Sequence, residues 1–412
     1  MRLNELQNRH LIAACAFFIP TLGVYLSGFF MPLMILVALL ILGLAVRRKT
    51  GGLKISWIAA AFFIALAAWG GLSSLWSIAP ERSLAQAFDI VGTAACGLVL
   101  MAGAKTLEPG ERRLIGVALL TGFGVATLFA TFEVFTNLSI YRLDNPLWGV
   151  EQPLHTKFNR WTTLLTLLTW PILLSIGPKP PSWKVVAIFA LVFAIIVQLE
   201  NASSLLGLLV GATAFVFALN SPKKTAIAFI CLTMAGVALA PHIPRVLPEP
   251  KTVWAAMPDI STSVIHRLYI WRYVADRIEE RPITGWGLDT GRNMPGRTRI
   301  VWNVGDGGEI LPLHPHNAIL QWWMELGLVG AVIGGLCLTW LFVTIQRRRM
   351  NRFQNAAFTG ALAAGIVVAS TSYGIWQAWW LAGMFLVAAI MVGLAGEEGR
   401  EALPEAASPG KR

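Results

Sequence analysis

The sequence predicts an all-α integral membrane protein of about twelve transmembrane helices. Of the 412 residues, 56% are hydrophobic and only 13% are charged, and the mean hydropathy is +0.62. A soluble domain carries roughly 25% charged residues, so this chain has too little polar surface to cover a particle in water. Lipid is therefore the expected solvent.

The second observation is a series of apolar runs along the whole chain, each of about the length that crosses a bilayer as a helix. Nine predicted spans fall within residues 1–241 and three within 317–395, with a long loop at 242–316 between them. The polar stretch 396–412 is expected to be a disordered cytoplasmic tail. The twelve predicted spans are 11–28, 31–46, 55–74, 87–105, 114–135, 161–177, 185–199, 204–219, 225–241, 317–345, 356–372 and 375–395.

The basic residues give the orientation. They gather in alternate short loops, as in Arg47-Arg48-Lys49 and Arg347-Arg348-Arg349, whereas the short loops on the other side hold few. By the positive-inside rule the basic loops and both termini lie in the cytoplasm, and the loop 242–316 lies outside. The net charge of +11 is thus a topology signal, and no nucleic-acid partner is expected.

No metal or other cofactor is expected. The outer loops contain no Asp-x-Asp pair and no cluster of His, Asp and Glu at ligand spacing, and the four cysteines lack metal-binding spacing.

The loop 242–316 contains one predicted amphipathic helix. From Ser263 to Arg281, apolar residues recur at helical spacing, and Arg272 and Asp276 are spaced for an i,i+4 ion pair. Pro282 ends the helix and begins a tight turn. The helix either belongs to a folded lid or lies on the bilayer surface with its arginines at headgroup level.

His316 directly precedes the tenth predicted span. Pro315 suits the first turn of a helix, so His316 is expected at a helix N-terminus, where free N–H groups favour anions. A histidine in this position can accept a proton near neutral pH. The alternative is an interfacial histidine without a chemical role.

Helical spacing along this span predicts two different faces. Gly327 falls on the face of His316 with Gly330 close by, a stripe of small residues that would let another helix pack tightly. Glu325 falls on the opposite side, where a carboxylate within a span is expected to face a protein interior. A structural pair with Gln321 and a catalytic role are both open for it.

Two motifs resemble the signature of the O-antigen ligase and Wzy-type polymerase superfamily. His316-Asn317, nine residues, and then Gly327-Leu328-Val329-Gly330 form an HN-x9-GxxG pattern. Upstream, Arg267-Leu268-Tyr269-Ile270-Trp271 and Pro282-Ile283-Thr284-Gly285-Trp286-Gly287 resemble the same superfamily's loop pattern. Twelve spans with one large periplasmic loop between the ninth and tenth are similar to its architecture.

The resemblance implies a function. Members transfer a glycan from a polyprenyl diphosphate carrier to a lipid or glycan acceptor, at the periplasmic face of the bacterial inner membrane and among its lipids. They resemble metal-independent, inverting glycosyltransferases of the membrane-embedded GT-C class. Carried over, His316 would be the base that activates the acceptor hydroxyl, and Arg267 would bind the donor diphosphate. His314 and Asn317 would also contact substrate, and the structural positions would be Pro282, Gly285, Gly287, Gly327 and Gly330.

One segment departs from the superfamily pattern. Many members carry an arginine at the outer end of the short pair of spans, in a Ser-Arg-Gly-like context. Here that place is Glu200-Asn201-Ala202-Ser203-Ser204-Leu205, without an arginine. Arg160, at the mouth of the sixth span, is the expected second phosphate contact.

Four functions stay open on the sequence. A ligase that joins the glycan to lipid A-core or another acceptor is favoured. A polymerase that extends the carried glycan, a glycosyltransferase with a protein acceptor and a transporter without chemistry are the alternatives. A transporter predicts charged residues deep in several spans, whereas the titratable groups here cluster at outer helix ends.

Overall fold

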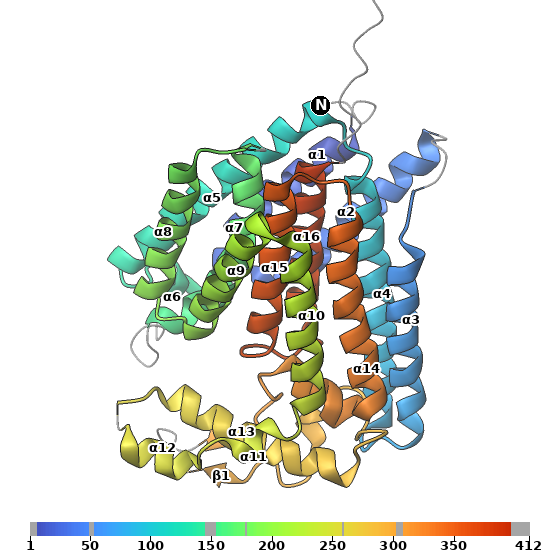
Figure 1. Cartoon of the computed structure of the whole chain (residues 1–412), viewed down its shortest axis with the longest axis vertical. Coiled ribbons are helices and arrows are strands. Elements are labelled where there is room, and N and C mark those ends of the chain that lie inside the picture. The colour runs from blue at the N-terminus through green and yellow to red at the C-terminus, as the bar shows by residue number, and fades with distance from the viewer. Residues whose placement is uncertain are drawn as a thin grey trace, which may run out of the picture.

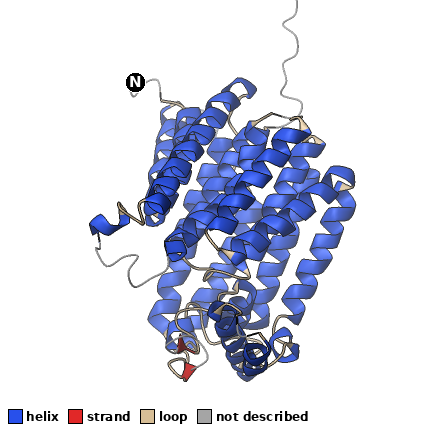
Figure 2. Cartoon of the chain, turned by 90° about the vertical axis from the view of Figure 1, so that its left-hand side faces the viewer, coloured by secondary structure: helices blue, strands red, loops and turns tan. Residues whose placement is uncertain are grey.

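Long helices form a bundle, and short elements form a cap at one end of it (Figures 1 and 2). The structure, a computed structural model, describes residues 6–48, 53–144, 154–177, 179–257, 259–301 and 308–396. The bundle comprises α1 (Asn8–Tyr25), α2 (Phe30–Arg47), α3 (Trp57–Leu72), α4 (Pro80–Ala104), α5 (Arg112–Phe135), α7 (Leu154–Ser175), α8 (Ser182–Gln198), α9 (Ala202–Asn220), α10 (Pro222–Leu239), α14 (Ala318–Arg347), α15 (Arg352–Ala369) and α16 (Ala378–Ala395).

The cap is the predicted outer loop. Its α13 runs across the lower end of the bundle in Figure 1, and the start of α1 lies at the opposite end. The two short strands pair antiparallel, with Ile300 opposite Glu309. The cap elements are α11 (Ile243–Val246), α12 (Pro250–Ala256), α13 (Thr262–Glu280), η5 (Gly291–Asn293), β1 (Ile300–Val301) and β2 (Gly308–Glu309); the remaining short turns are η2 (Ser27–Phe29), η3 (Ser73–Leu75), η4 (Pro109–Glu111) and α6 (Tyr141–Asp144).

The helices have the length and composition of a multi-pass membrane protein. Every predicted span coincides with a helix. Within the described residues, eight helices are long and apolar enough to cross a membrane, and Ser182–Gln198 is a shorter apolar helix. The all-helical membrane class is therefore confirmed, while the number twelve stays a prediction. The predicted tail lies outside the described residues, apart from Gly396.

The core lies around α7 and α16. In α16, 72% of the span is buried, whereas in α3 only 22% is buried. The large side chains of Trp161, Trp170 and Trp380 are fully buried there. Large apolar side chains are exposed on the outer helices, as expected where the surrounding solvent is lipid.

Helix α14 is broken at Gly327. This residue has φ 64° and ψ −159° in the middle of the helix, a conformation that side chains with a Cβ rarely adopt. A Cβ on Gly334 would lie 2.5 Å from the Trp322 ring, although a straight helix would separate these positions by about 18 Å. The segment before Gly327 therefore folds against the segment after it.

The break corrects the predicted faces of this span. His316 and Gly327 do not share a helical face, because the helix begins at Ala318 and its regular geometry ends at Gly327. A Cβ on Gly330 would lie 2.2 Å from the Leu326 side chain. The space beside Gly330 is therefore filled by the first segment of α14, and the space beside Gly327 by Ile283 of the following turn, so among the described residues no other helix packs on the predicted stripe here.

The turn Pro282–Gly287 satisfies the backbone groups that the break leaves open. The N–H groups of Trp286 and Gly287 donate to the carbonyls of Met324 and Glu325 at 3.0 and 2.8 Å, and the Leu328 N–H donates to the Pro282 carbonyl at 2.8 Å. Backbone groups without partners are costly where lipid replaces water. The turn is thus part of the helix's hydrogen bonding.

Two glycines allow this close contact. A Cβ on Gly285, which has φ +68°, would lie 2.4 Å from the Glu325 carbonyl oxygen, and a Cβ on Gly327 would lie 2.2 Å from the Ile283 carbonyl oxygen. Both obstacles are backbone atoms that cannot rotate away. Glycine is therefore required on each side of the contact.

Glu325 ties three parts of the chain together. Its buried carboxylate accepts hydrogen bonds from Gln321 Nε2 at 3.0 Å, the Asp289 N–H at 2.8 Å and Trp376 Nε1 at 2.6 Å. The partners come from α14 itself, the cap and the connection between α15 and α16. The hydrogen bond from Gln321 therefore supports the structural alternative for Glu325.

Helix α13 packs on the bundle through its apolar face. Ile270, Val274 and Ile278 form a buried cluster with Leu320 and Met324 of α14, so α13 is part of a folded cap.

The predicted ion pair between Arg272 and Asp276 is wrong. Arg272 pairs with Glu249 at 2.6 Å, and Asp276 lies 3.5 Å from Arg245. The α11–α12 segment brings better-placed partners against this face of α13.

We expect Gly327→Ala to destabilise the protein by about 3 kcal/mol or more, because it adds a side chain at positive φ and a backbone clash. The measurement is thermal unfolding of the purified protein in detergent. Gly124→Ala in α5 is the matched control: a Cβ there meets nothing within 4 Å, so its midpoint should stay at or slightly above that of the wild type. Equal midpoints for the two variants would contradict the role assigned to the break.

Candidate active site

The connection 370–377 between α15 and α16 brings the predicted site residues together. Its Ser372 carbonyl accepts a hydrogen bond from His316 Nδ1, and the next residue, Tyr373, interacts electrostatically with both predicted arginines, Arg160 and Arg267. Residues from α7, α13 and the start of α14 therefore meet at one place, at the cap end of the bundle.

His316 is held in an unusual backbone conformation. Its φ is 53°, in the left-handed region that non-glycine residues seldom occupy. Its N–H donates to His314 Nδ1 at 3.2 Å. Because Nδ1 of His316 faces the Ser372 carbonyl, Nδ1 carries the ring proton and Nε2 carries the lone pair. Nε2 has no hydrogen-bond partner within the described ranges.

His316 lies at the N-terminus of α14 as predicted, but the helix begins later than Pro315 suggested, since Asn317 is the N-cap. The Asn317 side-chain oxygen accepts from the N–H groups of Ile319 and Leu320 at 3.0 and 3.1 Å. An N-cap stabilises a helix by about 1 kcal/mol. The structure thus uses this oxygen of Asn317, a predicted substrate contact, to begin the helix.

His314 lies behind His316. Its buried ring is centred 4.3 Å from that of His316, and its Nε2 lies 3.1 Å from Gln377 Nε2. Burial first, and then the charges of His316 and Arg292, lower the pKa of His314 to about 3. A neutral His314 can accept a hydrogen bond from the His316 N–H. This arrangement favours a role for His314 in positioning His316 over the predicted contact with substrate.

The electrostatics leave His316 unprotonated at neutral pH. The pKa of His316 is lowered to about 4, mainly by burial and also by the charges of Arg267 and His266, while the Ser372 carbonyl acts in the opposite direction. A neutral imidazole with Nε2 free can accept a proton. The arrangement suits a general base.

Arg267 carries an uncompensated charge. Arg267 is partly buried, which lowers its pKa, and its Nε is buried without a hydrogen-bond partner. No carboxylate within the described part of the chain pairs with it. A partly buried arginine without a carboxylate is costly, so this position favours an anionic ligand.

Arg160 approaches the same place from α7. It donates to Ser27 Oγ at 3.3 Å, and its guanidinium lies 5.2 Å from the centre of the Trp379 ring. Among the residues that the structure covers, no carboxylate pairs with Arg160 either. Two guanidinium groups from different helices thus face one region, as in sites for phosphate groups.

The segment without the superfamily's arginine lies next to Arg160. Asn201 Nδ2 donates to the Asn159 carbonyl at 3.1 Å and to Thr162 Oγ1 at 2.8 Å. The Glu200–Leu205 turn therefore packs on the part of α7 that carries Arg160. Arg160, the predicted replacement for that arginine, lies on this neighbouring helix.

Sequence reasoning missed the residues of the 370–377 connection. The predicted spans 356–372 and 375–395 left almost no loop between them, whereas α15 ends at Ala369 and α16 begins at Ala378. The polar residues Ser372, Tyr373 and Gln377 were the available signal for a longer connection. Hydrophobicity alone assigned most of them to the spans.

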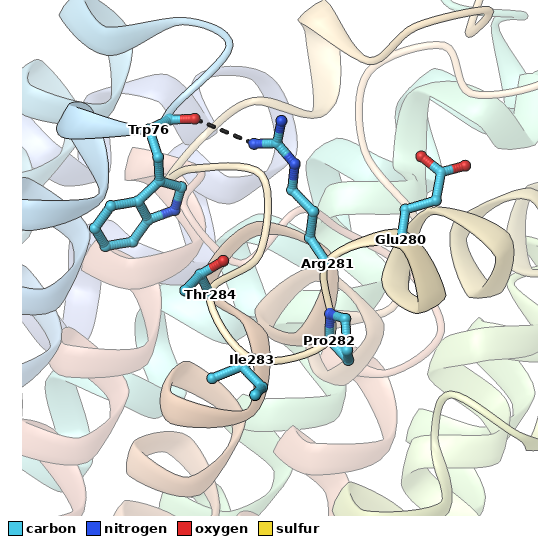
Figure 3. A pocket seen from close by; sticks show the side chains of 6 residues that line it. All are labelled: Trp76, Glu280, Arg281, Pro282, Ile283 and Thr284. Carbon is cyan, nitrogen blue, oxygen red and sulfur yellow. Dashed lines mark hydrogen bonds between the residues drawn. The ribbon is translucent and has the colours of Figure 1, made fainter.

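Two cavities lie elsewhere in the cap. The larger, of about 520 Å³, is lined by Trp76 and residues 280–284, and Figure 3 shows Arg281 donating to the Trp76 carbonyl at its edge. The smaller, of about 240 Å³, lies between the α11–α12 segment and α13. Neither is lined by His316, Arg267 or Arg160. Within the described residues no group of three metal-binding side chains occurs.

This chain is similar to O-antigen ligase-type proteins. Residues 186–335 match the family model described as O-antigen ligase. A Rickettsia felis protein named "Putative polysaccharide ligase" is 27% identical over 93% of this chain and 97% of its own length. A Rickettsia conorii protein of the same description is 28% identical over 79% of this chain and 77% of its own length. The resemblance drawn from the motifs, to an O-antigen ligase-type family, is confirmed.

The low pKa values of the two histidines predict acid lability. The folded state binds these protons only near pH 3 to 4, whereas an unfolded histidine binds them below about 6.5. The unfolded state therefore holds more protons between these values, and the free energy of unfolding should fall as pH drops, by up to about 1.4 kcal/mol per pH unit for each histidine.

The measurement is thermal unfolding in detergent from pH 7.5 to pH 4.5, for the wild type and for His314→Gln. The variant should show a shallower decline, since it has one group fewer to titrate. Parallel curves for the two proteins would contradict a neutral, buried His314.

Proposed function

We propose that this O-antigen ligase-type membrane protein transfers a glycan from a polyprenyl diphosphate carrier to an acceptor hydroxyl, at the periplasmic face of a bacterial inner membrane. The acceptor is lipid A-core or a similar glycolipid. The observation that carries the proposal is the neutral His316, with Nε2 free, beside two arginines that have no carboxylate partner within the described residues. The relatives named as polysaccharide ligases support the same class.

His316 acts on the acceptor. Its Nε2 accepts the hydroxyl proton as the acceptor oxygen attacks the anomeric carbon of the donor sugar. The bond from that carbon to the diphosphate oxygen breaks, and its electron pair leaves with the diphosphate. Attack opposite the leaving group inverts the anomeric centre.

Arg267 and Arg160 act on the donor. A guanidinium offers paired N–H donors that match phosphate oxygens. Fixed donors that stabilise the charge developing on the leaving diphosphate lower the barrier without a metal ion. Because Arg267 also lowers the pKa of His316, a bound diphosphate offsets this effect and makes His316 a stronger base when the donor is present.

The orientation rests on the charge pattern and on the position of the site. The basic loops require the ends of the helices opposite the cap to face the cytoplasm. The start of α1 lies at that end in Figure 1, and the cap and the 370–377 connection lie at the other. A periplasmic active site is consistent with both features.

Polymerisation of the carried glycan is the alternative that the motifs separate least. Surface polysaccharide from a deletion strain, resolved on a gel, distinguishes the two. Free polymer without lipid attachment supports a ligase, and single repeat units attached to core support a polymerase.

We expect His316→Ala to abolish transfer while donor binding survives, because the base acts on the acceptor hydroxyl and not on the diphosphate. Arg267→Ala should weaken donor binding by about 10- to 150-fold, since a hydrogen bond to a charged group contributes roughly 1.5–3 kcal/mol. Arg267→Lys should restore binding only in part, because the ammonium lacks the fork. The measurements are titration with a polyprenyl diphosphate glycan and a transfer assay on each purified variant.

Arg272→Ala is the matched control. Arg272 lies on another face of α13 and pairs with Glu249, so donor binding should stay near that of the wild type. Transfer by His316→Ala at the wild-type rate would rule out the base.

We also expect transfer to continue in EDTA. The described residues hold no cluster for a metal ion, and the arginines supply the charge that a bridging cation supplies elsewhere. The test is a transfer assay on metal-free protein with and without chelator. Activity that is lost in EDTA and restored by Mg²⁺ or Mn²⁺ would point to a metal-bridged diphosphate.

A further inference from the structure

The ring of Tyr373 packs against aromatic side chains of α16. It lies edge-on to the ring of Trp379, with centroids 4.7 Å apart, and its centroid lies 6.1 Å from that of Trp380. Arg160 lies over the same Trp379 ring at 5.2 Å. Tyr373 and Arg160 thus share one aromatic support, so their polar groups approach the same space.

The hydroxyl of Tyr373 interacts with a side chain of α7. The Thr163 hydroxyl lowers the pKa of Tyr373, and Thr163 Oγ1 lies 3.2 Å from Ser204 Oγ of α9. Both of these side chains are fully buried. A threonine that donates to the phenol oxygen leaves the phenol proton available for another acceptor.

The surroundings of this hydroxyl are cationic. Arg160 and Arg267 both act on it and favour its ionised form, but burial is the larger effect and raises its pKa above the ordinary value. Tyr373 therefore keeps its proton at neutral pH. A protonated phenol between two positive charges donates best to an anion.

We propose that Tyr373 is a third ligand of the donor diphosphate and donates its phenol O–H to a phosphate oxygen between Arg160 and Arg267. The inference rests on the proposed function and adds a residue to it. Three donors from α7, α13 and the 370–377 connection then surround the leaving group. The phenol proton stays on Tyr373, so this contact forms and breaks no covalent bond.

The position of Tyr373 also links the donor to the base. Ser372, the preceding residue, holds His316 Nδ1 through its carbonyl. A diphosphate that fixes Tyr373 therefore fixes the group that orients His316. Binding of the donor and orientation of the base depend on the same two residues.

The test compares full-length wild type with Tyr373→Phe in lipid nanodiscs. The probes are a polyprenyl diphosphate without sugar and the matching polyprenyl monophosphate. We expect Tyr373→Phe to bind the diphosphate about 10-fold or more weakly and the monophosphate less than about 3-fold more weakly, since one phosphate can bind to an arginine alone. The melting temperature should change little, because the ring and its packing remain.

Two further variants sharpen the result. Tyr269→Phe removes a hydroxyl from a face of α13 other than the one that carries Arg267. It should leave the affinities for the diphosphate and for the monophosphate unchanged. Thr163→Val removes the group that orients the phenol and should give a smaller loss for the diphosphate in the same direction.

The outcomes separate this inference from the proposed function. If Tyr373→Phe binds diphosphate like the wild type while Arg267→Ala does not, the Tyr373 contact is wrong and the proposed function stands. Equal weakening for both probes would make Tyr373 a packing residue and overturn the contact. A wild type that binds diphosphate no more tightly than monophosphate would overturn both.

Discussion

The break of α14 at Gly327 is the constraint on which the rest of the structure depends. A helix broken within a membrane exposes N–H and C=O groups that lipid cannot satisfy. Here the turn Pro282–Gly287 supplies the missing partners through its own backbone. The cap is therefore fastened to the bundle by hydrogen bonds that the helix itself requires. Sequence segments far apart along the chain become one unit.

This fastening determines the position of the site. The turn directly follows α13, the helix that carries Arg267, and therefore fixes the C-terminal end of α13. The apolar face of α13 also packs on the first segment of α14. The same short segment begins just after His316. Glu325 then binds Trp376 Nε1, which holds the connection that carries Ser372 and Tyr373. One buried contact region thus supports the candidate base and the groups beside it.

The arginines of the candidate site differ from those of the cap surface in their partners. Arg160 and Arg267 stand without carboxylate partners in the described parts of the chain, whereas the arginines of the cap surface, such as Arg245 and Arg272, are paired. Arg267 is partly buried, and such a cation without a carboxylate is unfavourable until an anion binds, whereas Arg160 is exposed. The histidines stay neutral in this field. In the proposed function, this charge distribution favours a negatively charged donor beside an uncharged base.

The sequence by itself determined the membrane class, the positions of the long helices, the amphipathic helix of the cap and the candidate site residues His316, Arg267 and Arg160. These follow from composition, from apolar runs and from local motifs, each of which acts over short stretches of chain. Only the tertiary structure decided the break at Gly327, the cap that Asn317 forms, the partners of Arg272 and the inclusion of Tyr373. Each of these depends on groups distant in sequence. Helical periodicity fails beyond Gly327 because the positive φ of this residue changes the direction in which every later side chain points.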